Sequence, residues 1–125
     1  MWPFDYRRRL FADPKKLGRW GEKKCELFLR KKGFETITRN YTTPGGEIDL
    51  VMMDTAVRPG AIVFVEVKTR RSEDFTKAQT AVNPRKRRKI IQVARQFARA
   101  YDLYNRPLRF DVVVVIPPDR GKPEI

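Results

Sequence analysis

The chain has 125 residues, which fits one domain, and 41% of them are hydrophobic, enough to form a core and to exclude an intrinsically disordered chain. Lys and Arg number 28 against 15 Asp and Glu, a formal net charge of +13. The single cysteine, Cys25, and the absence of histidine exclude an internal disulfide, a cysteine- or histidine-rich zinc site and histidine-based acid–base catalysis.

These counts indicate a partner and a type of metal. A strongly positive chain attracts polyanions, so nucleic acid is the first partner to consider; the alternatives are a surface that serves solubility and an acidic protein partner. Any metal ion must be held by carboxylate and carbonyl oxygens, because the chain offers no histidine and no cysteine cluster. Such oxygen ligands suit Mg²⁺ or Mn²⁺.

The chain divides into a central domain and two short ends. Residues 1–14 are predicted to be a poorly ordered basic arm, residues 15–116 the folded domain and residues 117–125 a C-terminal tail. The N-terminus lacks the apolar run of a signal peptide, and no stretch approaches the roughly 18 apolar residues of a membrane span. We therefore expect a cytoplasmic protein that does not enter a membrane.

Apolar periodicity predicts two helices and four strands. Apolar residues at helical spacing predict a first helix over residues 15–32, and Asn83-Pro84 predicts the start of a second over residues 84–104. Segments rich in β-branched residues predict strands over residues 36–41, 47–53, 61–68 and 108–116. The short turn after the second strand predicts an antiparallel hairpin, and the second helix provides the crossover to a parallel last strand. The sequence predicts an α/β domain with a mixed sheet of four to five strands flanked by helices.

The third predicted strand carries an acid and a base where a core strand would carry apolar residues. Glu66 and Lys68 are two residues apart and project from one face, opposite to a row of three valines. A hairpin turn centred near residue 57 places Asp49 opposite Glu66 or one position away. Facing carboxylates repel each other unless a proton or a cation lies between them. Asp49 and Glu66 therefore predict a divalent-metal site with Lys68 beside it.

Two further acids are predicted near this site. Glu47 shares a face with Asp49, and Glu22 lies at the border of the apolar stripe of the first helix. Each is either an accessory metal ligand or a surface acid. For the central pair, the alternative is that Glu66 and Lys68 are edge-strand residues that pair with each other or with Asp49. From the pattern alone, both interpretations stay open.

Basic residues cluster around the second helix. Cations at a helix start oppose the helix dipole and repel one another, so local stability does not explain them, whereas a bound phosphate backbone would. Lys86 lies one turn before Ile90 on the inward stripe, so its alternative place is beside the metal site. The other alternative is a solvated basic face. The predicted DNA-binding residues are Arg70, Arg71, Arg85, Lys86, Arg87, Arg88 and Lys89.

Several motifs resemble those of one protein family. Gly46-Glu47-Ile48-Asp49-Leu50 and Val63-Phe64-Val65-Glu66-Val67-Lys68-Thr69-Arg70 are similar to motifs of the YraN-like family of small bacterial proteins. Further matches, which extend the resemblance over roughly residues 18–115, are Gly21-Glu22, Arg39-Asn40, Lys86 with Ile90 and Ala94, and Arg109-Phe110-Asp111-Val112. That family is grouped with the PD-(D/E)XK nuclease superfamily and resembles archaeal Holliday junction resolvases. Ile48 stands where the superfamily has its signature proline.

The resemblance implies a restriction-endonuclease-like core and a Mg²⁺- or Mn²⁺-dependent endodeoxyribonuclease that acts on branched or repair-intermediate DNA. It implies Asp49 and Glu66 as metal ligands and the carbonyl of Val67 as a third. Lys68 is then the catalytic lysine, and Glu22 matches the helix acid of resolvase-like members. Such relatives usually dimerise, which implies a homodimer here. The alternatives from another class are a non-catalytic nucleic-acid-binding protein and a subunit of a DNA-processing assembly.

Overall fold

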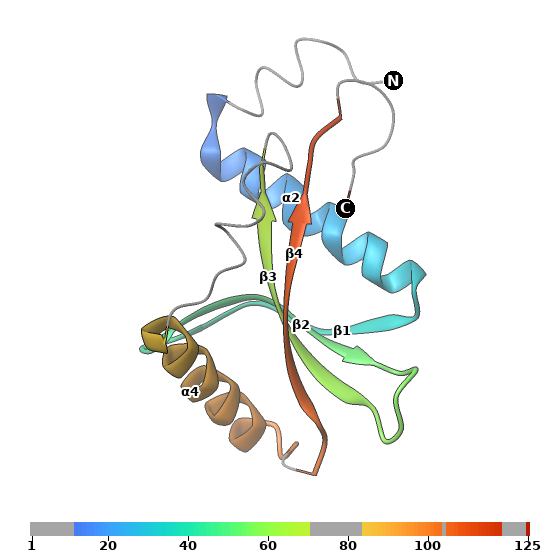
Figure 1. Ribbon diagram of the computed structural model, residues 1–125, viewed down its shortest axis with the longest axis vertical. Coiled ribbons are helices and arrows are strands. Elements are labelled where there is room, and N and C mark those ends of the chain that lie inside the picture. The colour runs from blue at the N-terminus through green and yellow to red at the C-terminus, as the bar shows by residue number, and fades with distance from the viewer. Residues whose placement is uncertain (1–11, 71–83, 104, 119–124) are drawn as a thin grey trace.

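The computed structural model describes residues 12–70, 84–103, 105–118 and 125 (Figure 1). Within these residues the chain forms two helices and four strands, all of which the sequence predicts. In chain order they are α2 (Pro14–Lys31), β1 (Phe34–Thr43), β2 (Gly46–Asp54), β3 (Ala61–Thr69), α4 (Pro84–Ala100) and β4 (Leu108–Val115). Neither of these two helices is long and apolar enough to cross a membrane.

The strands form one mixed sheet in the order β1-β2-β3-β4. β1 pairs with β2 and β2 with β3 in antiparallel fashion, whereas β3 and β4 are parallel, so both predicted pairings are confirmed. The single-domain α/β arrangement is consistent with a restriction-endonuclease-like core. β3 lies between β2 and β4 in the sheet, but Glu66 and Lys68 lie beyond its last pairing with β2 and pair with β4 alone, as the edge-strand alternative expects.

Helix α2 begins one residue earlier than expected because its N-terminus is capped. The Asp13 side chain accepts hydrogen bonds from the backbone N–H groups of Lys15 and Lys16, and Pro14 occupies the first turn. Gly33, at φ +95°, follows the C-terminus in the left-handed region that glycine tolerates. Asp13 and Pro14 therefore belong to the helix and not to the N-terminal arm. Residues 1–11 of that arm, residues 119–124 of the tail and Asn83 lie outside the described residues.

Helix α4 ends at Ala100, four residues before the expected end. The backbone N–H of Leu103 donates to the carbonyl of Ala98, and Asp102 adopts a left-handed φ of 54°. This geometry turns the chain out of the helix and toward β4. Periodicity alone extended the helix because Tyr101 continues its apolar stripe.

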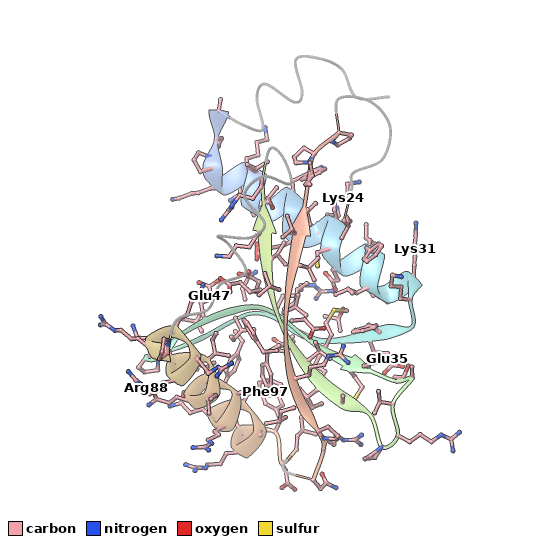
Figure 2. All side chains as sticks on the ribbon, in the orientation of Figure 1. Lys24, Lys31, Glu35, Glu47, Arg88 and Phe97 are labelled. Atoms are coloured by element: carbon pink, nitrogen blue, oxygen red, sulfur yellow. The ribbon has the colours of Figure 1, made fainter. Side chains whose placement is uncertain are left out.

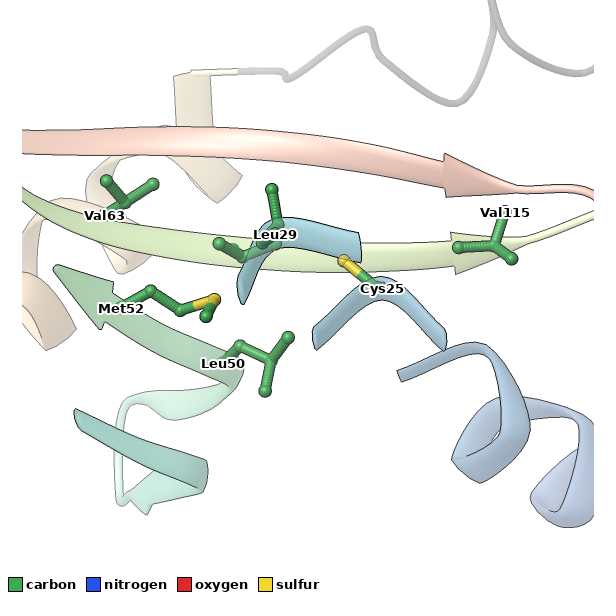
Figure 3. Close-up of a cluster of buried hydrophobic side chains, with 7 residues drawn as sticks. Cys25, Leu29, Leu50, Met52, Val63 and Val115 are labelled. Atoms are coloured by element: carbon green, nitrogen blue, oxygen red, sulfur yellow. The ribbon is translucent and has the colours of Figure 1, made fainter. Parts of the chain in front are cut away.

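The two helices cover opposite faces of the sheet. Cys25 and Leu29 of α2 pack on one face in a buried cluster (Figure 3) with Leu50, Met52, Val63, Val65 and Val115. Phe97, Val93 and Ala94 of α4 pack on the other face against Ile48, Val51, Ile62 and Phe64. Two apolar layers on one sheet supply the core that the composition predicted.

The sheet divides at one end, and this division positions the candidate site. Pairing between β2 and β3 ends at Leu50 and Val65, whereas β3 and β4 stay paired as far as Thr69 and Val115. Beyond this point β2 pairs with β1 alone. Figure 1 shows β1 and β2 curving away from β3 toward α4, and a Cβ added at Gly45 would lie 3.7 Å from the Val93 side chain of that helix.

Gly21 sets how closely α2 approaches the end of β3. A Cβ placed on Gly21 would lie 1.8 Å from the Oγ1 atom of Thr69, much too close for van der Waals contact. We predict that Gly21→Ala lowers the free energy of unfolding by about 1–3 kcal/mol through overpacking, measured by urea denaturation.

Gly18→Ala is the matched control on the same helix, because a Cβ there meets no atom within 4 Å. This control is expected to raise the free energy of unfolding by about 0.5–1 kcal/mol, the usual gain from replacing a mid-helix glycine. Equal effects of the two substitutions would contradict the close contact between α2 and β3.

Candidate functional site

Asp49 lies where β2 separates from β3. Its Oδ2 atom accepts a hydrogen bond from the backbone N–H of Val67 at 2.8 Å. The last paired residues are Leu50 and Val65, so the hairpin register follows the predicted turn position, and Asp49 and Glu66 are the next residues beyond the paired part of the two strands. The backbone N–H of Val67, which has no partner on β2, thus donates to the Asp49 carboxylate instead, and this bond holds the carboxylate next to β3.

Glu66 is the centre of a cluster of charges. Its Oε1 atom lies 2.9 Å from Nζ of Lys68 on the same strand and 3.0 Å from Nζ of Lys86 in the first turn of α4. Burial by itself raises the pKa of Glu66, but the hydrogen bonds and charges of the two lysines outweigh it and hold that pKa below its usual range. The structure therefore brings Glu66 and Lys68 together as predicted and adds Lys86 to them.

The acids around Asp49 repel one another. Burial and the charges of Glu66 and Glu47 raise the pKa of Asp49, against the opposing effects of the Val67 N–H and Lys68. Burial and the charges of Asp49 and Glu47 also raise the pKa of Glu22 to about 7. Glu22 and Glu47 therefore lie close enough to interact with Asp49, Glu22 as a half-buried acid and Glu47 as an exposed one.

An ion pair between the buried Glu26 and the exposed Arg39 supports the α2 side of the site. Glu26 accepts hydrogen bonds from Nε and Nη2 of Arg39 at 2.8 and 2.6 Å and from Oγ1 of Thr36 at 2.6 Å. These bonds, Arg39 first among them, lower the pKa of Glu26. This pair was not predicted from the sequence, although a signal exists: Glu26 follows Cys25 in the buried stripe of α2, where an acid requires a partner.

The predicted DNA-binding residues fall into two groups. Arg85, Arg87, Arg88 and Lys89 are exposed on α4, and Figure 2 shows Arg88 on the outer side of that helix while Phe97 points toward the sheet. Lys86 is half-buried on the inward side of α4 and contacts Glu66, which is the second of the two positions that the sequence allowed for it. Arg70 is half-buried and donates to the carbonyl of Thr69. Arg71 lies outside the described residues.

The donor chemistry of this cluster fits a hard divalent cation. Across the described parts of the chain, no three acidic or cysteine side chains stand together as a ready metal cage. Mg²⁺ does not require one, because it is usually held by one or two carboxylates and keeps several waters. Asp49 and Glu66 supply such carboxylates, and a cation would offset the burial and the repulsion that together raise the pKa of Asp49. The Val67 carbonyl remains a predicted third ligand.

These observations define an α/β protein in which acids and lysines meet beside an interior strand of a mixed sheet. A family model described as "Uncharacterised protein family UPF0102" matches residues 21–115, and the chain belongs to this family. It is 42% identical over 112 residues to a UPF0102 protein of Solibacter usitatus, which covers 88% of this chain and 80% of that protein. It is 40% identical over 111 residues to a UPF0102 protein of Syntrophomonas wolfei, with 89% and 92% coverage.

The raised pKa of Glu22 predicts how the site titrates. We expect carboxyl ¹³C NMR in the presence of a chelator to give a pKa of about 7 for Glu22, and Asp49→Asn to lower it by removing a neighbouring charge. The folded pKa exceeds the unfolded one, so the contribution of Glu22 to stability is fully present below about pH 4.5 and is lost as the pH rises through about 7. Glu22→Gln should flatten this dependence.

Glu35→Gln is the control for the titration, because Glu35 is an exposed acid on β1, away from Asp49. It should leave the pKa of Glu22 unchanged. A Glu22 midpoint that is the same in wild type and Asp49→Asn would show that the two carboxylates do not interact.

Proposed function

We propose that this protein is a cytoplasmic, Mg²⁺- or Mn²⁺-dependent endodeoxyribonuclease that hydrolyses phosphodiester bonds in branched or repair-intermediate DNA. The observation that carries the proposal is the hydrogen bond from the Val67 N–H to Asp49, which fixes a carboxylate beside the Glu66–Lys68 pair. Two carboxylates and an ammonium on adjoining strands are a group that suits metal-dependent phosphodiester hydrolysis. The YraN-like resemblance points to the same reaction.

Each side chain has a distinct role in the proposed reaction. A divalent cation bound by Asp49 and Glu66 would polarise the phosphate and lower the pKa of a water. Asp49 is held in place by the Val67 N–H, so its carboxylate is oriented before any ligand arrives. Lys68 is placed by the strand beside Glu66, where its ammonium can orient the attacking water or offset charge that develops on the phosphate.

The proposed DNA path crosses the exposed start of α4. Arg85, Arg87, Arg88 and Lys89 form no ion pair with any other described residue, and the first turn of α4 contains no acid. A phosphate backbone would neutralise these cations and accept hydrogen bonds from them. Because Lys86 in the same turn contacts Glu66, DNA bound to this surface, named here the α4 cation surface, would lie close to the carboxylates.

A second candidate function is DNA binding without cleavage. The net charge of +13 and the α4 cation surface favour binding on their own, and they require nothing of Asp49. Under this alternative the acids serve the fold, and the protein acts as a binding subunit in a larger DNA-processing assembly. Variants of the carboxylates and of the cations distinguish the two functions.

Two sets of substitutions should separate cleavage from binding. With a panel of linear and branched DNAs and Mg²⁺ or Mn²⁺, Asp49→Asn should lower the cleavage rate by a factor of about 100 or more but leave DNA affinity intact. Replacing Arg85, Arg87 and Arg88 by Ala should weaken binding to all DNAs alike and flatten the salt dependence by about one unit of slope for each phosphate that the variant no longer neutralises.

The control triple variant replaces Arg30, Lys31 and Lys32 by Ala, because it removes the same charge. Figure 2 shows Lys31 and Arg88 on opposite sides of the molecule. This control should keep the wild-type salt slope. Wild-type protein that binds the panel but cleaves none of it with either metal would contradict the nuclease and favour the binding protein. An unchanged salt slope in the α4 variant would move the DNA path elsewhere.

A further inference from the structure

One oxygen of Glu66 is shared by two lysines from different elements. Nζ of Lys68 and Nζ of Lys86 lie 2.9 and 3.0 Å from the same Oε1 atom. A carboxylate oxygen offers two lone pairs, and both are taken when it accepts from two ammonium groups. Two positive charges at this distance also repel a divalent cation that approaches the same oxygen. The arrangement therefore opposes metal binding at Oε1 as long as both lysines stay.

The two lysines differ in how easily each can leave. Lys68 comes from the same strand as Glu66, two residues further along, and its side chain is only 19% exposed. Lys86 reaches Glu66 from α4, and its side chain is 41% exposed. Four exposed cations of the α4 cation surface surround Lys86 in sequence. Lys86 is thus the ammonium that can exchange Glu66 for an external anion.

We propose that Lys86 is a positioning residue that occupies Glu66 in the absence of DNA and transfers to a DNA phosphate when the backbone binds the α4 cation surface. The transfer frees one of the two lone pairs of Glu66 Oε1, while Lys68 keeps the other, so that the metal binds more tightly when DNA is present. No covalent bond changes; one ion pair is exchanged for another. The inference rests on the proposed function, because it needs both the metal and the phosphate.

This exchange couples two binding events. If DNA removes the competitor for Glu66, it raises the affinity of the site for the cation, and linkage requires that the cation raise the affinity for DNA by the same factor. Coupling between sites is commonly on the order of 5- to 150-fold. For a part-exposed ion pair we expect the low end of this range, about 5- to 10-fold.

The first experiment measures Mn²⁺ affinity by calorimetry without DNA. Lys86→Gln should bind Mn²⁺ about 5- to 10-fold more tightly than wild type, whereas Lys86→Arg, which keeps the charge, should restore the weak binding. Arg95→Gln is the matched control, because it removes one exposed charge from the same helix. Circular dichroism checks that each variant is folded, and Lys86→Met provides a second neutral side chain.

The outcomes separate this inference from the proposed function. Equal Mn²⁺ affinities for Lys86→Gln, Lys86→Met and Arg95→Gln would overturn the competition but leave the metal site intact. Titrations of wild type and Lys86→Gln that match those of an Asp49→Ala, Glu66→Ala double variant would overturn the metal site itself, and the inference with it.

The second experiment tests the transfer to DNA. A fluorescent phosphorothioate duplex, which resists hydrolysis, is titrated with protein with and without Mn²⁺, and binding is followed by anisotropy. The ratio of the two affinities should be about 5- to 10-fold larger for wild type than for Lys86→Gln, because only wild type has a competitor to displace. Screening of the DNA by Mn²⁺ is common to both proteins and cancels in this comparison. Equal ratios would overturn the exchange.

Discussion

The separation of β2 from β3 is the constraint on which the site depends. A strand that leaves a sheet exposes backbone donors on its former neighbour, and a buried donor without an acceptor is costly. In this protein the Asp49 carboxylate accepts from the Val67 N–H at that point, so one hydrogen bond both completes the backbone pairing and orients an acid. Gly21 lets α2 approach β3 closely at Thr69. This approach brings Glu22, the next residue of α2, close enough to interact with Asp49.

Charge is distributed unevenly across this site. On the side of α2, Asp49 and Glu22 have raised pKa values, because burial and mutual repulsion dominate there. On the side of α4, two lysines hold the pKa of Glu66 low. The ionised form of Asp49 is thus destabilised by burial and by its acidic neighbours, whereas the negative charge of Glu66 is already balanced by two lysines. A divalent cation and an incoming phosphate would redistribute these charges, which is why the two are expected to bind together.

Local rules predicted the strands and the face of Glu66 and Lys68, because alternation has a period of two and the turn position sets the hairpin register. They left open whether Lys86 lies on the DNA-binding surface or beside the metal site, because that depends on how α4 lies across the sheet. They did not predict the Asp49–Val67 hydrogen bond, which arises only where the ladder ends. Motif and resemblance predicted which residues form the site, whereas tertiary packing decides which of their atoms are in contact.

The most direct test of the account is the position of a bound cation. Crystals of the protein with a phosphorothioate duplex and Mn²⁺ would be measured by anomalous scattering. The account predicts a peak between the carboxylates of Asp49 and Glu66, at coordination distances of about 2.0–2.2 Å from an oxygen of each, with Lys86 moved to a phosphate. A duplex bound across α4 with no anomalous peak between these two carboxylates would contradict it.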